Sequence, residues 1–200
     1  MRVISVVNAK GGTAKTTTAI YLATAFAGAG SRPVVLVDLD PQGSAGEWAE
    51  RAQEAGEPLP FEVLEFAGQA EGLSRLVRRG FADTLYVLDT PPADPATIDA
   101  AIGVSDFVVV PTRTYGIELA RVWQTLPSLE GVDHAVLITS ARLGTRSLGA
   151  VLGVLDEMEV PRFHNVIALR EAIPDSWGGV PTRLHGYGEV AEEIMDWRTT

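Results

Sequence analysis

A glycine-containing loop near the start of the chain holds the residues best suited to bind phosphate. The run NAKGGTAKTT at residues 8–17 lies between a short apolar run and a stretch of helical length. In a strand, loop and helix in this order, backbone N–H groups and the positive end of the helix point at one spot, which suits a polyphosphate. Only two of the sixteen basic residues are lysine, and both lie in this loop, where an ammonium group is a compact donor to phosphate. We therefore predict a phosphate site, rather than a glycine-rich turn with surface lysines.

Two carboxylates, Asp38 and Asp40, follow the next apolar run in the sequence DLDPQGS. Residues two apart on extended backbone point to the same side, so both are expected to face the crevice at the carboxyl ends of the strands. Taken alone, the pair could also be solvated charges or caps for the helix that follows.

A third aspartate, Asp89, ends the apolar run Leu85–Leu88 and is followed by TPP. A buried strand that delivers one carboxylate to Mg²⁺ or to a metal-bound water has this form. The phosphate loop and the two aspartate segments follow one another on successive predicted strands, so we expect them to meet at one edge of a sheet.

The elements that must position these groups alternate along the chain. Because the apolar runs are mostly continuous, the strands are expected to be buried on both faces. We predict an α/β fold, a doubly wound and mostly parallel β-sheet with helices on both faces, in a single domain over residues 1–200. Strands are expected at Val3–Val7, Val34–Val37, Phe61–Phe66, Leu85–Leu88, Phe107–Val110, Val136–Thr139 and Phe163–Ala168, and helices at Thr16–Ala29, Ser44–Ala55, Leu73–Arg79, Pro95–Val104, Ile117–Leu129 and Ser147–Met158.

The composition excludes several other classes of protein. The sequence has no cysteine, which removes disulfides, thiolate nucleophiles and cysteine-held metal centres. Its three histidines, His134, His164 and His185, are scattered, and we interpret them as ordinary surface or core residues. A formal net charge of -10 disfavours a simple basic nucleic-acid binder. The first predicted strand leaves no room for a signal peptide, and no run reaches the ~20 apolar residues of a membrane helix, so a cytoplasmic protein is expected.

Compared with the general phosphate-loop pattern G-x-x-x-x-G-K-[ST], the end of the loop fits but alanine occupies both glycine positions, Ala9 and Ala14. The loop instead resembles the deviant form K-G-G-x-x-K-T-T of the ParA/MinD family of ATPases. DLDPQG and DTPP resemble the next two elements of that family, and beyond residue 92 the similarity is mainly one of layout. This chain has Ala14 where the family usually has glycine. From this departure we expect that the position does not require a positive φ angle.

The resemblance implies that ATP and Mg²⁺ are the cofactors. Lys15 would neutralise the β- and γ-phosphates in its own subunit, Thr16 would supply a hydroxyl to Mg²⁺, and Thr17 would lie near the α-phosphate. The implied ATP-binding residues are Lys10, Gly11, Gly12, Thr13, Ala14, Lys15, Thr16 and Thr17.

The resemblance also implies a shared active site. Lys10 would cross to the nucleotide of a second subunit, so that hydrolysis requires a homodimer with two ATP molecules between the protomers. Asp40 would position the attacking water and thus act in catalysis with Lys10 and Lys15, while Asp38 and Asp89 would reach Mg²⁺ through water.

In the second half of the chain the indications are fewer. By position, Arg170 and Pro174 resemble the stretch that closes over adenine in relatives. A non-specific DNA surface is expected from the arginines of this half, Arg142, Arg146, Arg162 and Arg183. Five acidic residues lie in the same stretch, so a solvated face of mixed charge remains an equal alternative.

The function expected from the resemblance is ATP-driven partition or positioning of plasmid or chromosomal DNA. The partners would be non-specific DNA and a ParB-like or other centromere- or cargo-binding adaptor, in a cytoplasmic, nucleoid-associated protein without membrane contact. The alternatives are MinD-like positioning, positioning of a protein organelle, or a biosynthetic enzyme of the same superfamily. Acidic residues near the end of the sequence argue against an anionic membrane surface, and Lys10 with DLDPQ argues against the biosynthetic enzymes.

Overall fold

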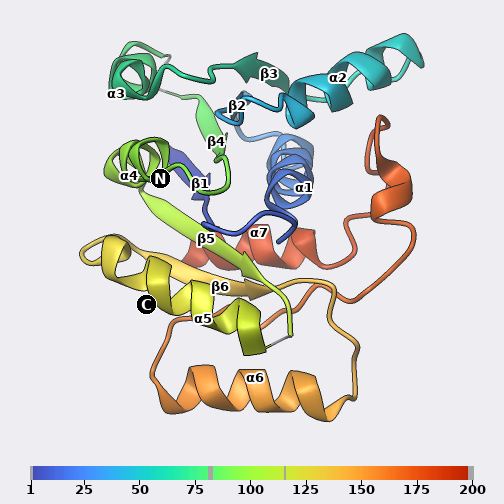
Figure 1. Ribbon diagram of the computed structural model, residues 1–200. Coiled ribbons are helices and arrows are strands. Elements are labelled where there is room, and N and C mark those ends of the chain that lie inside the picture. The colour runs from blue at the N-terminus through green and yellow to red at the C-terminus, as the bar shows by residue number, and fades with distance from the viewer. Residues whose placement is uncertain (1, 81–82, 115, 198–200) are drawn as a thin grey trace.

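The computed structural model describes residues 2–80, 83–114 and 116–197, without the side chains of residues 116–118 and 121. Within this part of the chain, six parallel strands form one sheet in the order β3-β2-β4-β1-β5-β6. The fold class expected from the sequence is confirmed (Figure 1). The strands are β1 (Val3–Val6), β2 (Val34–Asp38), β3 (Glu62–Glu65), β4 (Leu85–Asp89), β5 (Phe107–Thr112) and β6 (His134–Ile138).

Helices cover both faces of the sheet. One face packs against α1 (Lys15–Gly28), α2 (Ser44–Glu54) and α7 (Tyr187–Asp196). The other packs against α3 (Ala70–Arg79), α4 (Pro95–Val104), α5 (Gly116–Thr125) and α6 (Arg146–Glu157). Two short 3₁₀ turns, η1 (Leu126–Leu129) and η2 (Pro174–Ser176), complete the described elements. Among the described residues, none of the helices is long and apolar enough to cross a membrane.

Strand alternation decides which face each acidic side chain joins. In β4, Leu85 and Val87 belong to the cluster under α1 and α7, whereas Tyr86 and Leu88 belong to the cluster under α3 and α4. Because successive strand residues point to opposite faces, Asp89 continues the face of Val87, toward α1 and α2. The same alternation in β2 places Asp38 on that face.

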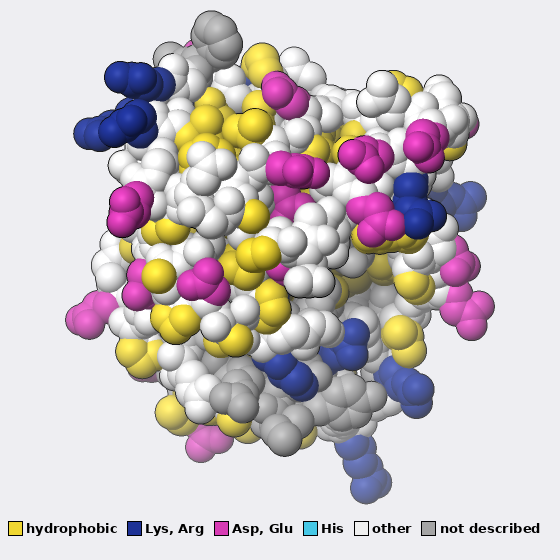
Figure 2. All heavy atoms as spheres, turned by 45° about the horizontal axis from the view of Figure 1, so that its top comes forward, with side chains coloured by type: hydrophobic (Ala, Val, Ile, Leu, Met, Phe, Trp, Pro, Cys, Tyr) yellow, Lys and Arg dark blue, Asp and Glu magenta, His cyan; other side chains and the backbone are white. Residues whose placement is uncertain are grey.

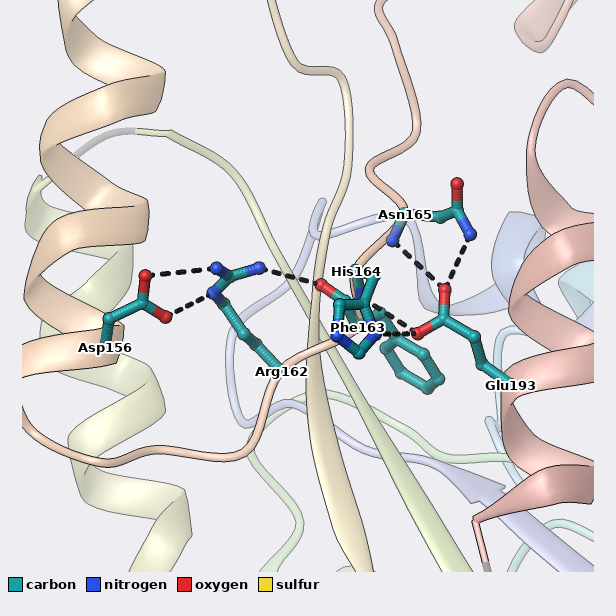
Figure 3. A network of polar contacts seen from close by, with 6 residues as sticks. All are labelled: Asp156, Arg162, Phe163, His164, Asn165 and Glu193. Carbon is teal, nitrogen blue, oxygen red and sulfur yellow. Dashed lines mark hydrogen bonds and ion pairs between the residues drawn. The ribbon is translucent and has the colours of Figure 1, made fainter. Parts of the chain in front are cut away.

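The strand predicted at Phe163–Ala168 is wrong, because a side chain competes for its backbone N–H groups. Residues 162–168 run beside β6 but make only isolated parallel bridges, Val136 with Arg162 and Ala141 with Ala168. The backbone N–H groups of His164 and Asn165 donate instead to the Glu193 carboxylate of α7, at 2.8 and 3.1 Å (Figure 3). A regular ladder cannot form where a side chain takes the amides.

Two helical expectations also change. The predicted helix Ile117–Leu129 is α5 followed by η1, which has a proline, Pro127, in its first turn; proline lacks the N–H that an α-helix would need there. Helix α7 is not among the helices predicted from the sequence, where its acidic residues served only as an argument against a membrane surface. Val190, Ala191 and Ile194 nevertheless give it a buried stripe against the core.

Candidate nucleotide site

Buried side chains fix the start of the loop at residues 8–17. The Asn8 amide donates to the Pro111 carbonyl at 2.8 Å, and its oxygen accepts from the Lys10 backbone N–H at 2.9 Å. The Thr90 hydroxyl donates to the Val6 carbonyl at 2.8 Å, and the Ala93 N–H donates to the Ala9 carbonyl at 3.0 Å. The ends of β4 and β5 therefore hold the loop on both sides, and DTPP has a structural role that the sequence pattern did not reveal.

The expectation for Ala14 is wrong. Ala14 has φ 67° and ψ 31°, in the left-handed region, directly before α1. Gly12 is also left-handed, with φ 75°. A left-handed residue before a helix turns successive N–H groups toward one point, which favours an anion there. The loop geometry thus requires a positive φ at residue 14, and alanine adopts it at a cost of about 1–2 kcal/mol.

Lys15 lies inside the loop. Its ammonium group donates to the Lys10 carbonyl at 2.9 Å, and only 6% of the residue is exposed. Burial lowers the pKa of Lys15, and the negative charges of Asp89 and Asp40 oppose that shift. A cation held here, between the loop amides and two carboxylates, suits a polyphosphate with its bound metal.

Asp89 is the most deeply buried carboxylate of the site. It pairs in register with Val6 of β1 and with Asp38 of β2, and its exposure is 0%. Burial raises the pKa of Asp89 to about 7, an effect that the Thr16 hydroxyl partly offsets and that the charge of Asp38 increases. Neither carboxylate oxygen has a hydrogen-bond partner of ordinary geometry among the described residues.

Such a carboxylate fits the outer shell of Mg²⁺. This ion usually keeps several waters and binds through one or two carboxylates plus substrate phosphates, so it does not require a cage of protein ligands. No group of three His, Cys, Asp or Glu side chains in the described residues could hold a metal alone. The Thr16 hydroxyl, Asp89 and Asp38 are the groups that would hold a hydrated Mg²⁺ beside a nucleotide.

Asp38 caps the next helix. One oxygen accepts from the N–H groups of Ala45 and Gly46 in α2, at 2.9 and 3.2 Å, and the other accepts from the Asp40 N–H at 3.0 Å. Burial raises the pKa of Asp38, and these backbone donors oppose the shift. Asp38 therefore caps the helix that follows it, which was one of the alternatives left open by the sequence. Asp40 is half-buried, and its carboxylate accepts from the Gln42 N–H at 3.0 Å.

A pocket of about 560 Å³ adjoins the loop on the side away from Asp38 in the sheet order. The structure brings Arg170 and Pro174, the two residues expected near adenine, together with Gly12 and Thr17 at its wall. Sequence reasoning missed Arg113 and Tyr187, which also line this pocket. Arg113 could have been noticed because it directly follows β5, whereas nothing near Tyr187 in the sequence indicates a binding role.

The four arginines expected to bind DNA lie in different surroundings. Arg142 and Arg146 are exposed and follow the carboxyl end of β6, at the same sheet edge as the phosphate loop. Arg183 is exposed in the segment before α7. Arg162 is paired with Asp156 through two hydrogen bonds of 2.6 and 3.0 Å (Figure 3), which is the mixed-charge alternative. On the face drawn in Figure 2, acidic side chains are spread over the surface, and basic side chains lie at the upper left, toward the bottom and, at the right, beside acidic ones.

Comparison with known proteins adds to this geometry. Residues 1–78 match the family model AAA_31, described as an AAA domain. The chain is 38% identical to Maintenance of carboxysome distribution protein A of Gloeobacter kilaueensis, over 98% of this chain and 96% of that protein. It is also 38% identical to the chromosome-partitioning ATPase Soj of Thermus thermophilus, with the same coverage of both. A putative plasmid partition protein of Borrelia burgdorferi, solved with AMPPNP, has the same fold, with a TM-score of 0.78 at 17% identity over 99% of this chain and 98% of that one.

Proposed function

This chain belongs to the ParA/MinD family of P-loop ATPases, and we propose that it hydrolyses ATP in a nucleotide-sandwich dimer that partitions or positions a large cargo. One observation carries the proposal. A loop with two lysines lies beside three carboxylates at a single sheet edge, and the innermost carboxylate, Asp89, is fully buried with only the Thr16 hydroxyl of the loop acting on it as a donor.

Within one subunit, the loop amides and Lys15 would bind the phosphates. Thr16, Asp89 and Asp38 would hold Mg²⁺, which when bound neutralises charge on the phosphates. Arg170 and Pro174 would contact adenine in the neighbouring pocket. The Asp38 cap on α2 is compatible with this role, because a carboxylate oxygen can accept from an amide and from a metal-bound water.

Hydrolysis would need the two less buried groups. Lys10 is half-buried at the mouth of the loop, from where it would reach the nucleotide of a second subunit. Asp40 is close enough to Lys15 and Asp89 for its charge to affect the pKa of both, so it would orient a water near the γ-phosphate. Basal turnover would be weak and would rise with DNA and a partner protein.

The cargo that we propose first is plasmid or chromosomal DNA, in line with whole-length similarity to a chromosome-partitioning ATPase. The ATP dimer would bind DNA without sequence preference through Arg142, Arg146 and Arg183 on each protomer. Such binding must be salt-dependent, because it releases counterions from the phosphate backbone. Arg162 would contribute less, since its guanidinium is held by Asp156.

A second candidate cargo is a protein organelle. This chain is as similar to the carboxysome distribution protein as it is to the partition ATPase, with the same identity and the same coverage. Both candidates would use the same ATP switch, so the cargo is decided in cells. Cells that lack the protein should lose plasmid or chromosome copies in the first case, and should show clustered protein compartments with normal DNA inheritance in the second.

The experiment that tests the proposed biochemistry is a gel shift at low salt with a non-hydrolysable ATP analogue. We expect a shift that requires the analogue and Mg²⁺ and that disappears as salt rises. The double variant Arg142→Ala/Arg146→Ala should shift less DNA, whereas Arg162→Ala serves as the matched control. Binding that ignores nucleotide or salt would exclude the ATP-switched DNA surface.

A further inference from the structure

A short irregular segment, residues 173–179, connects the pocket beside the phosphate loop to helix α2. At one end, Ile173 and Pro174 line the pocket. The chain then turns through η2 and rises past α1 toward α2, at the right of Figure 1. Regions that are far apart in the sequence are thus joined by seven consecutive residues, which we call the brace.

The middle of the brace is fastened to α1. The Tyr21 hydroxyl of α1 and the Ser176 hydroxyl are hydrogen-bonded at 3.0 Å, and Ser176 also donates to the Ile173 carbonyl at 2.7 Å. The Tyr21 ring packs on Tyr187, at a centroid distance of 4.9 Å. The Tyr187 hydroxyl in turn meets the Thr18 hydroxyl at 3.1 Å. The brace therefore rests on the helix that begins in the phosphate loop.

The far end of the brace is fastened to α2. The indole N–H of Trp48 donates to the Gly179 carbonyl at 2.8 Å. The rings of Trp48 and Trp177 lie 5.0 Å apart, tilted by 59°. Gly178 has φ 75°, and a Cβ there would come within 2.9 Å of the Arg51 side chain. Trp48 is 2% exposed and Trp177 is 41% exposed, so α2 supplies a fixed ring and the brace supplies a surface ring that packs on it.

Helix α2 is closely tied to Asp40. Only residues 41–43 separate Asp40 from the start of α2, and the Gly43 N–H donates to the Asp40 carbonyl at 2.9 Å. The Asp38 carboxylate fixes the first amides of α2. Because the connection is short and hydrogen-bonded, a displacement of α2 must move Asp40.

We propose that the brace relays binding of the nucleotide base to Asp40, with Trp48 and Trp177 as positioning residues. The inference rests on the proposed function, since it needs ATP in the site. A base held against Ile173 and Pro174 fixes the brace, and the brace then fixes α2 and the water-orienting aspartate. A ligand with phosphates but no base would fill the loop and leave the brace unsupported. Recognition of the base thus acts on the rate of hydrolysis as well as on affinity.

The test compares ATP turnover with inhibition by inorganic tripolyphosphate in the whole protein. For Trp177→Ala we expect KM for ATP to rise about twofold to threefold and kcat to fall by a similar factor, so that kcat/KM falls about fourfold to tenfold, the range expected for loss of one aromatic pair. The inhibition constant of tripolyphosphate should stay at its wild-type value. Trp177→Phe, which keeps a ring, should restore most of kcat. Met195→Ala removes a side chain of similar exposure, 44%, on α7, and should behave like the wild type.

The outcomes separate the brace from the proposed function. If Trp177→Ala keeps the wild-type kcat and KM, or if tripolyphosphate binding weakens in parallel with ATP, the relay is wrong although the ATPase stands. If the wild-type protein does not hydrolyse ATP under any condition that includes DNA, the proposed function fails and the relay fails with it.

Discussion

Two sets of charged groups in the nucleotide site differ in how deeply the fold buries them. The inner groups, Lys15, Asp38 and Asp89, are 6%, 1% and 0% exposed. The outer groups, Lys10 and Asp40, are half-buried at the mouth of the same crevice. Burial shifts the pKa of every inner group. The inner groups are therefore set by the fold of one chain, whereas the outer groups lie where water can reach them and where the proposed second subunit would.

This difference suggests a division of labour. Charges in a buried, low-dielectric position interact strongly with a bound polyphosphate, which favours tight binding within one subunit. Less free energy is needed to move the half-buried groups at the mouth of the crevice, so their positions would change when a partner binds. The inner groups would therefore govern nucleotide binding and the outer groups turnover, and each substitution below tests that separation.

The largest effect on binding is expected for Lys15→Ala. Loss of the buried ammonium removes charge-assisted hydrogen bonds to the phosphates, so ATP affinity should fall by about 100-fold or more. Titration calorimetry with a non-hydrolysable analogue measures this. An affinity within threefold of the wild type would place Lys15 outside the phosphate site.

Asp40→Ala should have the opposite profile. ATP binding should survive within about threefold, while turnover falls by about 10²–10⁴, the range for loss of a group that manages a proton or an attacking water. Steady-state hydrolysis in the presence of DNA checks the rate. Equal turnover in variant and parent would remove Asp40 from the mechanism and leave the outer groups without a catalytic member.

Asp89→Asn should show how much the burial of this ionised carboxylate lowers the free energy of unfolding. The folded-state pKa is raised to about 7, above the unfolded value, so the contribution of Asp89 to stability is full below about pH 4 and is lost as pH rises toward 7. The nucleotide-free variant should therefore be more stable than the wild type at pH 8, by up to about 4 kcal/mol, and nearly equal to it at pH 4. Thermal melts at the two pH values measure the difference, and a gain independent of pH would refute the assignment.

The smallest effect is expected in the loop backbone. Ala14→Gly relieves a left-handed alanine and should stabilise the protein by about 1 kcal/mol. Ala55→Gly is the matched control, because Ala55 is exposed with φ -72° and ψ -6°, where glycine should be destabilising by about 0.5–1 kcal/mol. Melting temperatures that shift in the same direction for both variants would contradict the strain at residue 14.

How far the sequence predicts this molecule depends on the range of the interactions. Asp38 and Asp89 each end an apolar strand, so the local pattern was enough to predict that they meet at one edge of the sheet. The pocket wall is different. Tyr187 reaches Thr18, and Trp177 reaches Trp48, across more than a hundred residues, and nothing local in the sequence encodes these contacts.

Two other predictions from the sequence were wrong because the tertiary structure outweighs the local preference of the chain. Residues 163–168 have the composition of a strand, but Glu193 from a distant helix takes two of their amides. At Ala14, an alanine in a glycine position suggested ordinary backbone, whereas the loop, which is anchored at Asn8 and Ala9, enters α1 through a left-handed residue. In both places the tertiary structure overrides the local preference.

The central claim is that Lys10 joins two protomers across ATP, and sedimentation of the wild type and of Lys10→Ala tests it most directly. With Mg²⁺ and a saturating non-hydrolysable ATP analogue, the wild type should sediment with the mass of two chains and without nucleotide with the mass of one. Lys10→Ala should bind the analogue through its inner groups and keep the mass of one chain. A wild type that stays a single chain at saturation, or a variant that dimerises equally well, would contradict the account.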